Sequence, residues 1–195
     1  MQHHVSQRIV LRIIASGFLL TSILNFASLA FPPDMSQNPP VYPAMTLLLQ
    51  SFALAILIFA STVYGIRLAE EKMTLAAAGF TMYAIANGIG IVIFFEMRHF
   101  TSEEYEKIYE IMGVATMLVV PSCALMGFCT DFPRWIRWAP LGTGLIMLLP
   151  TILYYAGDRQ FNVLDQISFA GYMLQQIVQI FWAVLLFRMA RHVHA

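Results

Sequence analysis

The chain has 195 residues and a formal net charge of zero; 59% of its residues are hydrophobic and only 11% are charged. An ordinary soluble domain has roughly 25% charged residues and could not keep this much apolar surface away from water. The balanced charge and the lack of a Lys/Arg-rich run exclude nucleic acid as a partner, so the composition predicts a protein embedded in a lipid bilayer.

Six segments are long and apolar enough to cross a bilayer, which takes about 20 residues of helix. We therefore predict an all-α integral membrane protein, with residues 1–195 forming a single transmembrane domain and no soluble domain. The six predicted transmembrane helices cover residues 9–30, 44–67, 73–96, 108–129, 138–156 and 166–188. Thr101 and Glu104 form a capping box that places the start of the fourth helix near Ser102. Pro121 and Pro150 lie inside spans, which membrane helices tolerate.

The first segment has a second interpretation. Arg8 and Arg12 precede an apolar run that ends in Ser28-Leu29-Ala30, a sequence that loosely resembles a signal-peptide cleavage site. The run is long for a signal peptide, and we interpret it as a retained span.

The basic residues predict the orientation of the chain. With six spans, the termini and the second and fourth connections share one side, which collects eight of the Lys and Arg residues and leaves three on the other. Because Lys and Arg are enriched in cytoplasmic loops, both termini are predicted to be cytoplasmic. The predicted location is the plasma membrane or a bacterial inner membrane.

A short pattern repeats along the chain. Gly17 is followed by Phe18 and then by Asn25, and the same pattern runs from Gly79 to Asn87. One interpretation is three helical hairpins with a period of about 62 residues. The other is a chance match between spans of equal length.

Polar side chains within the predicted spans are the main functional signal, because each costs free energy in a bilayer unless it is paired or hydrated. Most lie between the outer surface and the midplane, which predicts a polar pocket that opens outward. The candidate ligand-binding residues are Asn25, Gln50, Asn87, Tyr172, Gln175, Gln176, Gln179 and Trp182, with Glu96 and Asp165 at the pocket mouth. The alternative is that these amides only hold helices together.

Other chemistry has little support in the sequence. Cys123, Met126 and Cys129 are soft ligands of the kind that bind Cu(I), but the two cysteines face different sides of a helix. No histidine lies within a span, and the motifs of common enzyme classes are absent. We predict no metal, no cofactor and no catalytic residue.

The sequence supports three functions in a definite order. The first is a small membrane protein that binds or transports a neutral, zwitterionic or amphipathic ligand, and it acts as a homo-oligomer or with a partner membrane subunit. The second is a sensor or accessory subunit that transports nothing. The third is an enzyme that modifies lipids, with Glu96, Arg98 and His99 at the interface.

Overall fold

A computed structural model describes the backbone of residues 2–37, 39–96, 102–158 and 160–192, and the side chains of residues 7–37, 39–93, 104–158 and 160–192. The elements in chain order are α1 (Gln2–Ser28), α2 (Ala44–Glu70), α3 (Thr74–Glu96), α4 (Ser102–Met126), α5 (Arg134–Arg137), α6 (Ala139–Tyr155) and α7 (Phe161–His192). Among the described residues, six helical segments are long and apolar enough to cross a membrane. The prediction of an all-helical chain with six such helices is confirmed, and it indicates a multi-pass membrane protein.

The helix boundaries differ from the predicted spans mainly at the ends. α1 and α7 extend beyond the apolar runs, because hydropathy marks the part of a helix inside hydrocarbon and not the helix itself. α4 begins at Ser102 as predicted, although Thr101 lies outside the described residues. It ends at Met126 and not at Cys129, because the amides of residues 127–129 each donate to a carbonyl three residues back, as in tighter turns and not in an α-helix.

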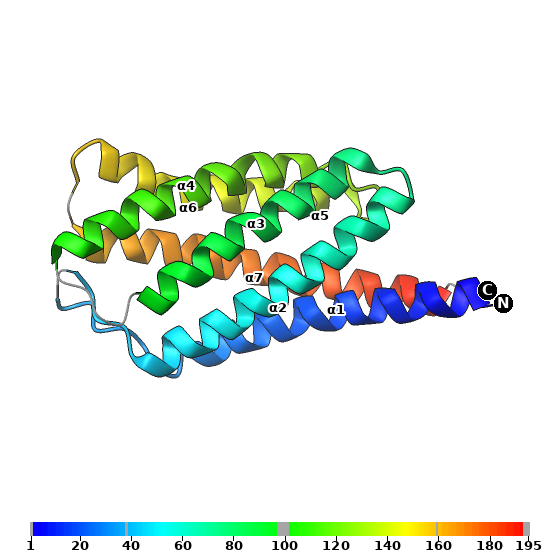
Figure 1. Cartoon of the computed structure of the whole chain (residues 1–195), viewed down its shortest axis with the longest axis horizontal. Helices are drawn as coiled ribbons and strands as arrows, with labels where there is room; N and C mark the ends of the chain where they lie inside the picture. The colour runs from blue at the N-terminus through cyan, green and yellow to red at the C-terminus, as the bar shows by residue number, and fades with distance from the viewer. Residues whose placement is uncertain (1, 38, 97–101, 159, 193–195) are drawn as a thin grey trace.

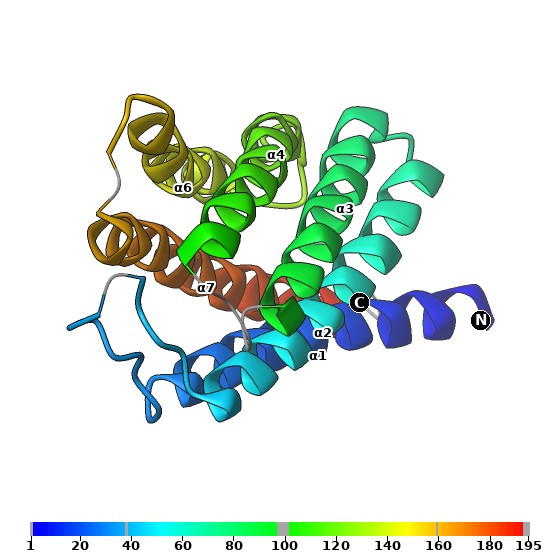
Figure 2. The same ribbon diagram turned by 60° about the vertical axis from the view of Figure 1, so that its left-hand side comes forward.

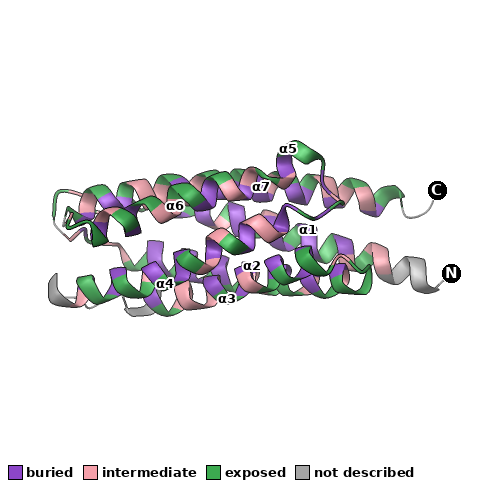
Figure 3. Cartoon of the chain, turned by 90° about the horizontal axis from the view of Figure 1, so that it is seen from above, coloured by how far each residue is buried: buried purple, intermediate pink, exposed green. Residues whose placement is uncertain are grey.

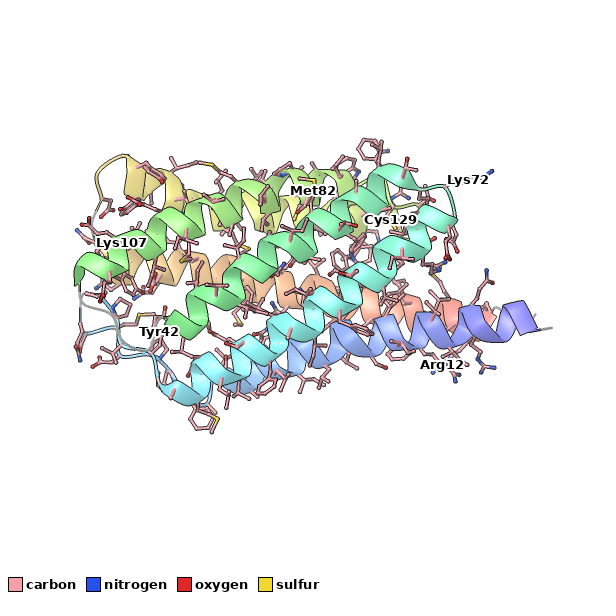
Figure 4. All side chains as sticks on the ribbon, viewed as in Figure 1. Arg12, Tyr42, Lys72, Met82, Lys107 and Cys129 are labelled. Carbon is pink, nitrogen blue, oxygen red and sulfur yellow. The ribbon has the colours of Figure 1, made fainter. Side chains whose placement is uncertain are left out.

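The six long helices form a closed ring. Each packs against two others, in the order α1, α2, α3, α4, α6, α7 and back to α1. Figure 1 shows that α1 starts and α7 ends at the same end of the bundle, which we call the terminal end. Figure 2 shows the helices side by side around the bundle. Figure 4 places Arg12, Lys72 and Cys129 toward the terminal end, and Tyr42 and Lys107 at the opposite end.

The surface and the interior of the ring have the polarity expected in a bilayer. Large apolar side chains such as Phe52, Ile85 and Met117 are more than half exposed on the outside. Polar side chains such as Gln176 and Gln179 are fully buried, and Figure 3 shows buried and exposed faces alternating along each helix. An apolar exterior of this extent is typical of a lipid-facing surface.

Aromatic side chains fill the half of the helix bundle near the terminal end. The Trp182 ring of α7 has its centroid 5.3 Å from those of Phe18 and Phe80 and 5.8 Å from that of Phe132. The Tyr64 ring packs edge-on against Phe80 at 4.7 Å. These side chains close the centre of the bundle at this end, and we call them the aromatic core.

An ionic network lies beside the aromatic core. Arg67 of α2 pairs through Nη1 with Asp131 at 2.8 Å and through Nη2 with Glu71 at 2.8 Å. The Tyr64 hydroxyl donates to the same Asp131 oxygen at 2.9 Å. The network ties the connection between α4 and α5 to α2.

Candidate functional site

A partly enclosed cavity of about 140 Å³ lies inside the helix ring, in the half opposite the terminal end. Helices α2, α3, α4, α6 and α7 form its wall together with the end of the connection between α1 and α2. Apolar residues such as Leu54, Ile93 and Val119 make up most of this wall. Its polar side chains are Tyr42, Gln50, Asn87, Thr116, Asp165, Ser168 and Tyr172.

Asp165 is the acidic residue among the described residues of the cavity wall, and it is only 4% exposed. Three tyrosine hydroxyls donate to its carboxylate: Tyr42 to Oδ2 at 2.8 Å, Tyr105 to Oδ2 and Tyr109 to Oδ1. Tyr105 and Tyr109 are four residues apart, so they share one face of α4. The ion pairs among the described residues lie in the network around Arg67, and none of them involves Asp165.

Aromatic packing fixes the positions of the two α4 hydroxyls. The Phe161 ring, at the start of α7, lies 5.3 Å from the Tyr105 centroid and 5.2 Å from that of Tyr109. The Tyr154 ring of α6 stacks on Tyr109 at 5.3 Å. The site around Asp165 therefore joins three helices through a packed aromatic cluster.

The connection between α1 and α2 brings Tyr42 to the site. Backbone hydrogen bonds of 2.9 and 3.2 Å pair Asp34 with Val41, and the Ser36 hydroxyl donates to the Asp34 carboxylate at 2.6 Å. This last bond, with a second from the Ser36 amide, lowers the pKa of Asp34. Burial, with the nearby Asp165 carboxylate, raises the pKa of Tyr42 above its usual range, so its hydroxyl is a protonated donor at neutral pH.

Gln50, a residue of the cavity wall, has a buried side-chain acceptor without a partner among the described residues. The Ser28 hydroxyl donates its one proton to the Asn25 carbonyl at 2.7 Å. Toward Gln50 Nε2, which lies 3.5 Å away, the Ser28 oxygen can therefore only accept. This orients the Gln50 amide and leaves Oε1 buried with no partner among the described residues. A buried acceptor without a donor is unfavourable, and a bound donor would satisfy it.

Two further polar residues of the wall are held by neighbours. The Tyr172 hydroxyl donates to Asn25 Oδ1 at 3.0 Å. Asn87 Nδ2 donates to the Tyr83 carbonyl, one turn earlier in α3, at 2.7 Å. Asn25 itself is fully buried behind Tyr172 and is not part of the wall.

The three glutamines of α7 are buried but lie outside the cavity wall. Gln175 accepts a hydrogen bond from the Thr143 hydroxyl of α6. Gln176 Nε2 donates to the Tyr172 carbonyl at 3.2 Å, and Gln179 Nε2 donates to the Tyr83 hydroxyl of α3 at 3.4 Å. Gln175 is therefore bonded to the neighbouring helix α6, and Gln179 to α3 across the bundle.

The structure thus separates the residues selected from sequence into two groups. Four of these residues line one cavity: Gln50, Asn87, Asp165 and Tyr172. Asp165, which was predicted at the pocket mouth, is part of the cavity wall. The others, Asn25, Gln175, Gln176, Gln179 and Trp182, lie outside the wall, Trp182 within the aromatic core. Glu96 ends α3, and its side chain lies outside the described residues.

Sequence reasoning missed the three tyrosines around Asp165. The spacing of Tyr105 and Tyr109 was a usable signal, because it puts two hydroxyls on one face of a helix near a membrane boundary. Tyr42 gave no such signal, since its contact with Asp165 spans 123 positions in the chain.

Comparisons of the chain with models of known protein families, with characterised proteins and with solved structures find no match to any of them.

Proposed function

We propose that this chain is a membrane protein that binds a small amphipathic ligand in the cavity of its helix ring and serves to carry or to sense it. The observation that supports this is the mixed wall of the cavity, which is mostly apolar with a few polar side chains at fixed positions. Ligand sites commonly have this composition.

The cavity volume limits the size of the ligand. Pockets for drug-sized molecules measure roughly 300–1,000 Å³, whereas an apolar cavity of ~150 Å³ in another protein accommodates benzene. At about 140 Å³, this cavity fits a molecule, or part of one, about the size of a single ring.

The distribution of basic residues supports the membrane orientation proposed with this function. With both termini in the cytoplasm, the cavity lies in the outer half of the bilayer, in a plasma membrane or a bacterial inner membrane. Six spans are few for a complete alternating-access carrier, so transport would involve a second copy or a partner subunit.

A sensor or accessory subunit is the second candidate. Its support is the pairing of Gln175 and Gln179 with other helices, which is how amides stabilise helix contacts in membranes. The third candidate, a lipid-modifying enzyme, depends on Glu96, Arg98 and His99, whose side chains lie outside the described residues.

Cysteine accessibility tests the proposed cavity with a matched pair of variants. In a background with both native cysteines replaced, we expect Ser168→Cys to react with a membrane-impermeant thiol reagent added from outside, because Ser168 lines the cavity. Ser61→Cys is the control, since Ser61 is fully buried in α2 and is not part of the wall. If Gln37→Cys in the exposed connection reacts while Ser168→Cys and Ser61→Cys are equally inert, the proposed site is wrong.

A further inference from the structure

The polar groups of the cavity favour a ligand that donates hydrogen bonds and carries positive charge. Each tyrosine hydroxyl has one proton, and Tyr42, Tyr105 and Tyr109 all direct theirs to Asp165. An ionised carboxylate only accepts and offers about four acceptor positions. Three are occupied, which leaves about one for a ligand at the cavity wall.

The charge of Asp165 has no counterpart among the described side chains. Burial of an anion in a membrane interior without a cation is unfavourable, and the three hydroxyls offset only part of this cost. Among the described residues of the cavity wall, Asp165 is the single Asp, Glu, Lys or Arg. An anionic ligand therefore meets no positive partner among the described side chains of the wall, whereas a cation meets a preformed counter-charge.

Gln50 is a residue of the same wall and has a second acceptor. Its Oε1 is oriented by the bond from Nε2 to Ser28 and is buried without a partner. The remaining acceptor position of Asp165 and the Gln50 Oε1 atom can each accept a hydrogen bond from an N–H group. The remaining wall, with Leu54, Met112 and Phe169, suits a hydrocarbon body.

We propose that the cavity binds a small protonated amine with an apolar body, with the Asp165 carboxylate as its counter-charge and Gln50 Oε1 as a neutral acceptor. This inference rests on the proposed function and specifies the chemical class of its ligand.

Protection of Ser168→Cys from the thiol reagent tests this selectivity in the full-length chain. The probes are matched in size: butylamine with butanol, and benzylamine with benzyl alcohol and benzoate. We expect one of the amines to slow labelling at a concentration at least about tenfold lower than its alcohol, and benzoate to have no effect.

Two variants test whether Asp165 and Gln50 produce the preference for amines. Asp165→Asn is expected to abolish the preference for amine over alcohol and leave protection by the alcohol within about twofold. Gln50→Leu is expected to weaken amine protection by several fold, and it keeps the proposal testable if Asp165→Asn does not fold. Glu110→Gln is the charge control, because Glu110 is exposed on α4 and outside the wall.

The outcomes separate the two proposals. Labelling of Ser168→Cys that no amine slows, or that alcohols slow equally, overturns the amine inference and leaves the cavity intact. Amine selectivity that survives Asp165→Asn also overturns it. Failure of Ser168→Cys to react at all, beside a reactive Gln37→Cys, overturns the proposed function and the amine inference together.

Discussion

Removal of one hydroxyl from the Asp165 site should destabilise the fold by a predictable amount. Tyr109→Phe deletes the donor to Asp165 Oδ1 and leaves a ring that can still pack on Phe161 and Tyr154. A hydrogen bond to a charged group contributes about 1.5–3 kcal/mol. We therefore expect Tyr109→Phe to lower the free energy of unfolding by about 2 kcal/mol.

The matched control is Tyr155→Phe. Tyr155 is 60% exposed, and its ring packs on Tyr154 at 5.3 Å. A surface substitution of this kind is expected to change stability by less than about 0.5 kcal/mol. The assay is reversible unfolding of the purified chain in mixed detergent micelles, followed by helical circular dichroism.

A double-mutant cycle with Asp165→Asn identifies the origin of the effect. If the hydroxyl acts through the carboxylate, the two substitutions together cost less than the sum of their separate effects. Equal stabilities of Tyr109→Phe and Tyr155→Phe, or full additivity in the cycle, would refute the assignment of Asp165 as a buried anion held by this hydroxyl.

Three further predictions concern helix packing and the terminal end. Gly79→Ala should destabilise by about 1–3 kcal/mol in the same assay, because a Cβ atom there would lie 2.7 Å from the α4 backbone. Gly142→Ala, with nothing within 4 Å of its Cβ position, should be neutral or slightly stabilising, and equal effects at the two glycines would contradict the packing of α3 on α4. Asp131→Asn should cost about 1–3 kcal/mol, because it weakens the bonds from Arg67 and Tyr64; unchanged stability would show that the network is not formed. Burial raises the pKa of Cys129 to about 11, so little thiolate exists at pH 8 and maleimide labelling of this thiol should be slow in the folded chain and fast after unfolding.

The spans were predictable from sequence because the bilayer imposes a simple requirement of length and polarity on each of them. Helix ends were less predictable, because they depend on local hydrogen bonds such as those of the tighter turns at residues 127–129, after α4. The four-residue helix α5, which follows Pro133, is too short to leave any hydropathy signal.

The candidate site was predictable in part, for a geometric reason. Depth along a helix follows from counting residues, so Gln50, Asn87 and Tyr172 could be placed at similar levels. The direction of each side chain relative to its neighbours depends on how the helices pack. Gln176 and Gln179 therefore have suitable depth and yet lie outside the cavity wall, which no single-helix pattern could reveal.

The cavity occupies one half of the helix bundle and the aromatic core the other, and this arrangement places different requirements on a carrier and on a sensor. The cavity ends near Leu54 and Tyr172, and the aromatic core of Phe18, Phe80 and Trp182, each at most 1% exposed, fills the centre beyond it. A ligand could cross the bilayer only through a second conformation in which these rings separate, whereas a sensor needs no such state.

Ser61 reports on that second conformation. It is fully buried in α2, three residues before Tyr64 and so on the same face as this ring. If the chain is a carrier, Ser61→Cys should become reactive toward an impermeant thiol reagent on the side of the terminal end when benzylamine is supplied on the other side, while Ser168→Cys becomes less reactive. Persistent protection of Ser61→Cys, with benzylamine demonstrably bound at Ser168, would exclude transport of this amine through the ring and favour a sensor, because a binding site closed by an intact aromatic core cannot release its ligand on the far side.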